Sequence, residues 1–321
     1  MEPGRSVRSE SPNGRRRVLW CSVGTLLLSL TRSALVAPVP EPAARARADS
    51  VVRVGVLQNG SYTVAPVPIE EYVSRVLAGE ALPGSEAAAL DALAIAIRTY
   101  TAANLARHQA EGFDLCDQTH CQVMRAATPA TDAAASRTAG RVLRYRGEPA
   151  SIYYSASCGG RTEQPSNVWP GAADPPYLPS RKDSGCDGGP KWTTELGLED
   201  LDRALTAAGF RGSLTDVRIQ SRNKSGRVAL LALEGLSPPV VSGQDLRAAV
   251  GRSLGWRHIQ STAFQLRRMP AGFRFEGHGY GHGVGLCVIG SSKLAAKGMS
   301  PLKILNRYFP GASVDRLARG G

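Results

Sequence analysis

The sequence has few aromatic residues (6%), no internal repeat and no dense lysine and arginine run beyond Arg17. It also has no recognisable nucleic-acid-binding motif. The mostly apolar stretch from Val18 to Leu30 is short for a membrane span, which needs about 20 residues. These absences argue against specific DNA readout and against a conventional transmembrane helix.

What is present fits a globular protein with a sizeable core. The 321 residues are 42% hydrophobic and 21% charged, enough for one large domain or two ordinary ones. The formal net charge is +12, and basic residues remain in excess, well dispersed, beyond residue 37. Such a charge favours loose attraction to an anionic polymer such as nucleic acid, a lipid surface or cell-wall material.

The first 49 residues are typical of an export signal and a linker. A polar, basic segment ending in three arginines precedes the apolar stretch, and small residues follow at 34–37. We therefore predict a signal peptide over 1–37, with an uncleaved anchor as the alternative, and a disordered Pro/Ala/Arg linker over 38–49. The chain is expected in the periplasm or cell envelope, touching a membrane only if the signal is uncleaved.

The chain is organised around residues 67–105. Pro68 suits the first position of a helix, and an apolar face with helical spacing follows. Glu80 continues that face, where burial and the negative helix end would raise its pKa toward that of a general acid. The alternative is that Gly79 ends the helix and Glu80 faces solvent.

A second helix, capped by Ser85, carries Arg98 in an otherwise apolar run. A buried arginine needs a partner, and Glu80 is a candidate. That pairing would lower the pKa of Glu80. The alternative is a surface arginine with a packed stem.

Three glycine-containing segments are typical of tight turns or of loops that pack closely on a neighbour. Asn59-Gly60 predicts a hairpin between two strands. Gly159-Gly160 follows another strand, and alternating glycines over 277–285 surround His278 and His282. Such backbone can wrap a ligand closely, although ordinary turns and structural histidine hydrogen bonds would give the same pattern.

Together these segments resemble the SpoIID/LytB family. Four blocks match in order: VPIEEYVSRVLAGE (67–80), AIRTY (96–100), YYSASCGGRTE (153–163) and GHGYGHGVGLC (277–287). The resemblance covers about 50–315 and implies an α+β, SpoIID-like domain. In it a helical catalytic segment packs on antiparallel strands, with a smaller inserted lobe near 195–265.

The resemblance implies a lytic transglycosylase. Such enzymes cleave the MurNAc–GlcNAc bond of peptide-free glycan strands, leave 1,6-anhydro ends and need no cofactor for catalysis. The catalytic glutamate of the family falls on Glu80. Expected substrate contacts are Arg98, Tyr154, Ser157, Gly160 and His282.

Three positions depart from the family pattern. Val288 replaces a glutamine, Ser291 stands where alanine is common, and Leu93 stands where a glutamine is frequent. The loss of two amides predicts a more apolar site, with altered substrate preference or weakened catalysis.

Five cysteines follow the signal segment. The resemblance implies a structural zinc bound by Cys116, His120 and Cys121, with His108 as the fourth ligand, against the alternative of a Cys116–Cys121 disulfide. A second disulfide would join Cys158 to Cys186, with Cys287 as a competitor for Cys158.

A different class of function stays open. A non-catalytic glycan-binding protein could recruit or stimulate a cell-wall amidase, as the name LytB suggests. A nucleic-acid partner is not expected, because an exported chain rarely meets one.

Overall fold

The computed structural model describes residue 47, residues 50–187 and residues 189–318. The predicted signal segment and nearly all of the linker lie outside these residues. The helices are α1 (Ile69–Glu80), α2 (Ala87–Ala103), α3 (Pro129–Arg137), α4 (Leu198–Ala207), α5 (Gly243–Leu254), α6 (Val288–Ala296) and α7 (Pro301–Tyr308). The strands are β1 (Val51–Gln58), β2 (Ser61–Pro68), β3 (Leu115–Cys116), β4 (Arg141–Tyr145), β5 (Glu148–Pro149), β6 (Tyr154–Ser155), β7 (Lys191–Gly197), β8 (Arg211–Arg222), β9 (Val228–Ser237), β10 (Val240–Ser242), β11 (Phe264–Met269), β12 (Gly272–His278), β13 (Leu286–Cys287) and β14 (Ser313–Arg316).

The predicted hairpin around Asn59-Gly60 is confirmed. Strands β1 and β2 pair antiparallel, and both turn residues have positive φ (50° and 83°), as a tight two-residue connection requires. Short strand β3 joins the other edge of β1 in parallel. This places the chain around residue 116 beside the start of the domain.

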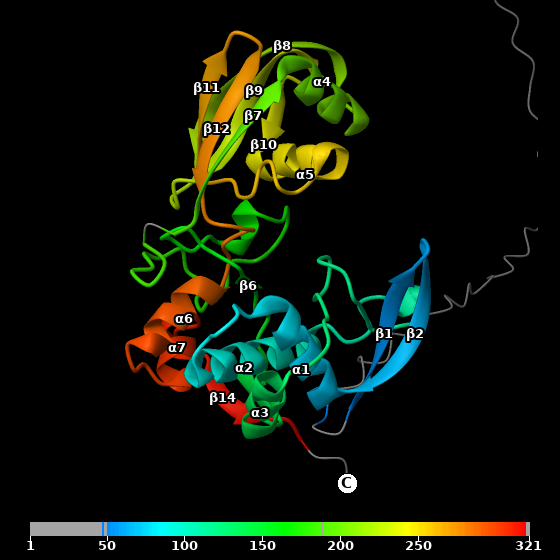
Figure 1. Ribbon diagram of the computed structural model, residues 1–321, viewed down its shortest axis with the longest axis vertical. Helices are drawn as coiled ribbons and strands as arrows, with labels where there is room; N and C mark the ends of the chain where they lie inside the picture. The colour runs from blue at the N-terminus through cyan, green and yellow to red at the C-terminus, as the bar shows by residue number, and fades with distance from the viewer. Residues whose placement is uncertain (1–46, 48–49, 188, 319–321) are drawn as a thin grey trace, which may run out of the picture. The chain divides into compact units, whose positions relative to one another are not determined.

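Helices α1 and α2 form the centre of the first hydrophobic core. The apolar face of α1 is buried as its spacing predicts, and α2 is buried over most of its length. Helices α3, α6 and α7 contact α2 (Figure 1). The sequence analysis did not predict α3, which starts at Pro129 behind a capping box made by Thr128 and Thr131.

A second hydrophobic core is built by the segments from Lys191 to His278, which extend beyond both ends of the expected lobe at 195–265. Two three-stranded sheets, β11-β12-β7 and β10-β9-β8, supply its strands. Helices α4 and α5 contact each other, and they contact β8 and β9 respectively (Figure 1). The buried side chains of this core include three phenylalanines: Phe264, Phe273 and Phe275.

The expected α+β class is confirmed, because helices and mostly antiparallel strands share both cores. In the part of the chain that the structure describes, no helix combines the length and apolar character needed to cross a bilayer.

Candidate functional site

Glu80 is the last residue of α1. The helix runs through Gly79, so the alternative in which Gly79 ends it is wrong. The Glu80 side chain is half-buried, and its Oε1 accepts a hydrogen bond from the backbone N–H of Val123 at 3.1 Å. Gly79 permits this approach, because a Cβ there would lie 2.3 Å from the carbonyl oxygen of Val123.

The surroundings of Glu80 favour its protonated form. Burial raises the pKa of Glu80 above 4.5, while the Val123 N–H and the positive charge of Arg125 oppose the shift. Among the described residues, no second carboxylate contributes to that shift. The site therefore offers a single acid with a raised pKa.

Gln122 is a site residue that the sequence analysis missed. Its buried amide accepts a hydrogen bond from the Tyr72 hydroxyl (3.1 Å) and donates one to the Tyr154 hydroxyl (2.8 Å). Burial and the charge of Glu80 raise the pKa of Tyr154 well above its ordinary value. Gln122 thus links Tyr154 to the segment that contacts Glu80.

The amide of Gln122 also bears on the expected apolar character of the site. Leu93 and Val288, which stand where the family often has glutamine, are buried apolar side chains. The site still contains an amide, because Gln122 reaches the Tyr154 hydroxyl from another segment. Gln122 follows Cys121 directly. Its position in a block of potential metal ligands is the one signal in the sequence that could have identified it.

Arg98 does not pair with Glu80, so that expectation is wrong. Its side chain has no exposed surface, and its Nε and Nη2 both donate to the carboxylate of Glu70. It also donates to the Arg141 carbonyl oxygen at 3.1 Å. This placement ties α2 to α1 and the start of β4, and it does not support the expected role in substrate contact.

Ser157 is likewise completely buried, with its hydroxyl 3.1 Å from the Cys186 sulfur. Gly160 is half-buried and adopts φ +99°, and its carbonyl oxygen accepts the Asp183 N–H. Both residues therefore shape the loop after β6. Among the described residues, Ser157 makes no hydrogen bond to Glu80, and Gly160 has no side chain that could reach it.

His282 lies beside Tyr154. Its Nδ1 accepts the Val284 N–H at 3.0 Å, and the ring also bonds the Tyr154 backbone. Burial, with the charges of Arg227 and Arg247, lowers the pKa of His282 to about 3. The ring is therefore neutral near pH 7, with its proton on Nε2.

The rings of Tyr153 and Trp169 stack with centroids 4.5 Å apart, and Trp169 lies 5.0 Å from the His282 ring. All three side chains are half-buried. They form a partly exposed aromatic group beside Tyr154, and the sequence analysis did not select Tyr153 or Trp169.

The glycine-rich loop at 277–285 packs closely on the backbone near Gly159 and on the buried guanidinium of Arg227. A Cβ at Gly283 (φ +78°) would lie 2.4 Å from the guanidinium of Arg227. A Cβ at Gly279 would lie 2.9 Å from the Gly159 nitrogen. The alternating glycines thus join the loop to the turn at 159–160.

The four residues expected to bind zinc lie together. Ligand atoms of His108, Cys116, His120 and Cys121 are all within 4.8 Å of one another. The Cys121 sulfur lies 3.4 Å from Nε2 of His108 and 3.7 Å from Nδ1 of His120. The Cys116 sulfur lies 3.8 Å from the same His120 nitrogen. These separations fit the edges of a tetrahedron around Zn²⁺, whose bonds are about 2.0–2.3 Å.

A carboxylate behind the ring of His108 strengthens this fit. Glu111 hydrogen-bonds Nδ1 of His108, which leaves Nε2 directed at the cluster. Metal-binding histidines usually have such an outer carboxylate, because it selects the ligating tautomer. The four residues therefore fit a closed metal site.

All five described cysteines are free thiols. Neither the Cys116–Cys121 disulfide nor the Cys158–Cys186 disulfide is present. Cys158, Cys186 and Cys287 instead converge, together with Asp183, in a second buried cluster.

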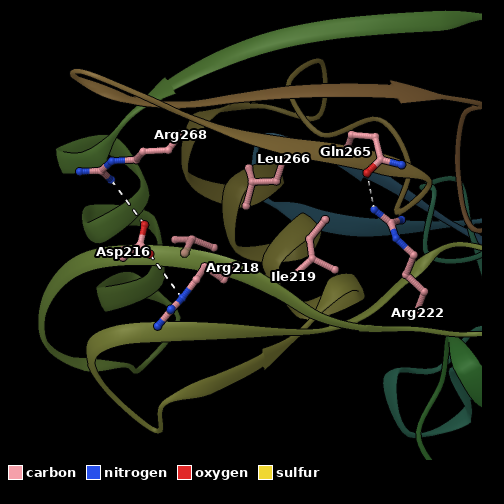
Figure 2. A pocket seen from close by; sticks show the side chains of 8 residues that line it. Asp216, Arg218, Ile219, Arg222, Gln265, Leu266 and Arg268 are labelled. Atoms are coloured by element: carbon pink, nitrogen blue, oxygen red, sulfur yellow. Dashed lines mark hydrogen bonds and ion pairs between the residues drawn. The ribbon is translucent and has the colours of Figure 1, made fainter.

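A pocket of about 540 Å³ lies on the second core, away from the predicted site residues. Figure 2 shows Asp216 between Arg218 and Arg268, and Arg222 bonded to Gln265. These arginines have partners within the chain. We assign no function to this pocket.

Comparison with known proteins finds two family profiles that each match part of the chain. The profile described as Stage II sporulation protein matches residues 58–145, and a domain of unknown function (DUF8618) matches residues 190–285. The match to the Stage II sporulation protein profile supports the predicted resemblance to the SpoIID/LytB family.

Three relatives illustrate the range of similarity. The chain is similar to an uncharacterised protein of Brachyspira hyodysenteriae (28% identity, covering 77% of this chain and 66% of the relative). It is similar to stage II sporulation protein D of Bacillus amyloliquefaciens (26% identity, 83% and 80%) and to the amidase enhancer of Bacillus subtilis (24% identity, 57% and 32%). The chain thus spans just under two thirds of the Brachyspira protein and about a third of the amidase enhancer.

Proposed function

We propose that this chain is an exported lytic transglycosylase. It acts in the cell envelope on peptide-free glycan strands of peptidoglycan and cleaves the bond between MurNAc and GlcNAc. Similarity to stage II sporulation proteins and to an amidase enhancer supports a cell-wall-related role. The observation that carries the specific proposal is Glu80, a half-buried carboxyl at the end of α1 with a raised pKa. No second carboxylate among the described residues contributes to that shift.

One carboxyl group suffices for this reaction. Protonated Glu80 gives its proton to the leaving glycosidic oxygen. The resulting carboxylate takes the proton of the C6 hydroxyl, which attacks the anomeric carbon and closes the 1,6-anhydro ring. Hydrolytic glycosidases instead commonly need a pair of carboxyl groups.

The neighbours of Glu80 have supporting roles in this proposal. The Val123 N–H stabilises the carboxylate after proton transfer, and Gln122 holds the Tyr154 hydroxyl beside it. The aromatic group of Tyr153, Trp169 and His282 offers ring faces on which a sugar can pack.

The cluster of His108, Cys116, His120 and Cys121 would hold a structural zinc ion. With four protein ligands, zinc would stabilise the loop without supplying an open coordination site for chemistry. Because Cys121 directly precedes Gln122, the bound metal would help keep Gln122 and Val123 against α1.

The test is mass spectrometry of soluble products released from peptide-free glycan strands by the full chain. We expect anhydro-ended sugars from the wild type and from the control Glu86→Gln, whose exposed carboxyl lies just before α2. Glu80→Gln should release at least 100-fold less product, since general acid catalysis contributes about 10²–10⁴-fold.

Other results would redirect the assignment. Reducing-end products would indicate hydrolysis and a second carboxyl group. Bound strands without any cleavage by the wild type would favour a glycan-binding protein that stimulates an amidase. The amidase enhancer among the relatives makes that the second candidate function.

A further inference from the structure

A second cluster of potential metal ligands lies away from Glu80 and has no role in the proposed reaction. The sulfur atoms of Cys158, Cys186 and Cys287 and a carboxylate oxygen of Asp183 all lie within 4.8 Å of one another. All four residues are at most 2% exposed. We infer that these residues form a second closed metal site for a thiophilic divalent cation, with zinc as the expected ion.

The donor set is that of a structural tetrahedral site. Three thiolates and one carboxylate supply four ligands, and thiolates select zinc over magnesium or calcium. The Cys158 sulfur and Asp183 Oδ2 are already 3.3 Å apart, close to the edge length of such a tetrahedron. Three cysteines cannot all pair in disulfides within the cluster, whereas one ion uses every donor.

Hydrogen bonds around the cluster suit thiolates. The Cys287 sulfur accepts the backbone N–H groups of Cys158 (3.2 Å) and Gly290 (3.3 Å), the latter at the start of α6. The Ser157 hydroxyl lies 3.1 Å from the Cys186 sulfur. Outer groups of this kind orient metal ligands and stabilise their negative charge.

Asp183 is held in place in the same way. The Tyr308 hydroxyl donates to its Oδ2 at 2.8 Å, and the Gly185 N–H donates to Oδ1 at 3.0 Å. A Cβ at Gly290 would lie 2.4 Å from Oδ2, so only glycine leaves room for the carboxylate there. The backbone is thus shaped around this carboxylate.

A buried positive charge nearby is an independent observation. Arg227 is 1% exposed, and its Nη2 donates to the Cys158 carbonyl oxygen at 2.9 Å. Its Nε and Nη1 have no hydrogen-bond partner among the described residues, and Glu163 and the three cysteines lie within electrostatic range. Glu163 offsets part of this charge. Three neutral thiols add nothing to that, whereas three thiolates that bind one divalent ion make the charge of the cluster more negative by one.

The site would join segments that are distant in the sequence. Cys158 follows β6, Asp183 and Cys186 precede β7, and Cys287 caps α6. Binding would release three protons from the thiols and fix these segments beside Ser157, Gly160 and the glycine-rich loop. Its role is structural, since no coordination position stays open.

The experiment counts metal ions on the full chain, purified with zinc under reducing conditions, by native mass spectrometry. The wild type should bind two zinc ions. The double variant Cys116→Ser/Cys121→Ser, which removes two ligands of the first cluster, should bind one. In that background Asp183→Asn should weaken zinc binding at least tenfold, while the matched control Asp187→Asn, in the same loop but outside the cluster, should not.

Cobalt substitution gives a second readout. The Cys116→Ser/Cys121→Ser variant loaded with Co²⁺ should show thiolate-to-cobalt absorption and the visible bands of a tetrahedral ion. A folded double variant that binds no metal would overturn the inference, as would a mapped disulfide between any two of Cys158, Cys186 and Cys287 under these conditions. If a variant does not fold, the number of zinc ions bound by the wild type tests the inference. A wild type that binds one zinc ion or none would count against the second site. These results are independent of glycan cleavage.

Discussion

The ion pair between Arg98 and Glu70 allows a sharp test of what stabilises the first core. Glu70 accepts hydrogen bonds from Arg98 Nε (3.0 Å), from Arg98 Nη2 and from the Gly140 N–H (2.9 Å). Replacing Glu70 with alanine leaves a fully buried guanidinium without its counter-charge. Breaking a buried pair in this way costs about 3–5 kcal/mol.

The lower end of that range applies here. The side chain of Glu70 is 31% exposed, so water can reach part of the space that alanine would leave. Arg98 also keeps acceptors at Arg141, Ala135 and Thr138. We therefore expect Glu70→Ala to lower the free energy of unfolding by about 3 kcal/mol, and Tm by roughly 6–12 °C.

The matched control is the next residue. Glu71 is 55% exposed and lies 3.6 Å from Arg75 one turn away, so Glu71→Ala should cost about 0.5 kcal/mol or less. Urea unfolding followed by circular dichroism measures both variants. In an Arg98→Met background, Glu70→Ala should cost less than about 1 kcal/mol, because no buried charge is left unpaired. Equal losses for Glu70→Ala and Glu71→Ala in the wild-type background would refute the reasoning.

Two further predictions concern Glu80 and its neighbours. Since the folded-state pKa of Glu80 is raised, its protonated form is stable when buried, and stability is lost as pH rises through that pKa. The free energy of unfolding of Glu80→Gln, measured with urea, should therefore match that of the wild type below pH 4.5 and exceed it toward neutral pH. A difference between the two proteins that does not change with pH would contradict the raised pKa. Gly79→Ala should push the Val123 carbonyl away, break the bond from Val123 N–H to Glu80 and reduce glycan cleavage on the order of 100-fold. Unchanged cleavage by a folded Gly79→Ala protein would show that this contact does not position the carboxyl.

The elements that local patterns specify were predictable from the sequence. The apolar spacing from Ile69 to Leu77 places Glu80 on the buried side of α1, and Asn59-Gly60 sets the first hairpin. Four donors within fourteen residues, from His108 to Cys121, were also recognisable as one cluster. In the helix and the hairpin the partners are close in sequence, so local spacing determines which side chains meet. The four potential metal ligands were brought together by the family resemblance.

Contacts between distant segments could be decided only by the tertiary structure. Glu70 and Glu80 lie on the same helix, and nothing in their spacing shows which of them faces Arg98. Gln122 reaches Tyr154 from a segment without helix or strand periodicity. Cys158, Cys186 and Cys287 were expected to give one disulfide and one free thiol, but they meet Asp183 beside the buried Arg227. The packing of distant segments sets these distances, and no local propensity could predict them.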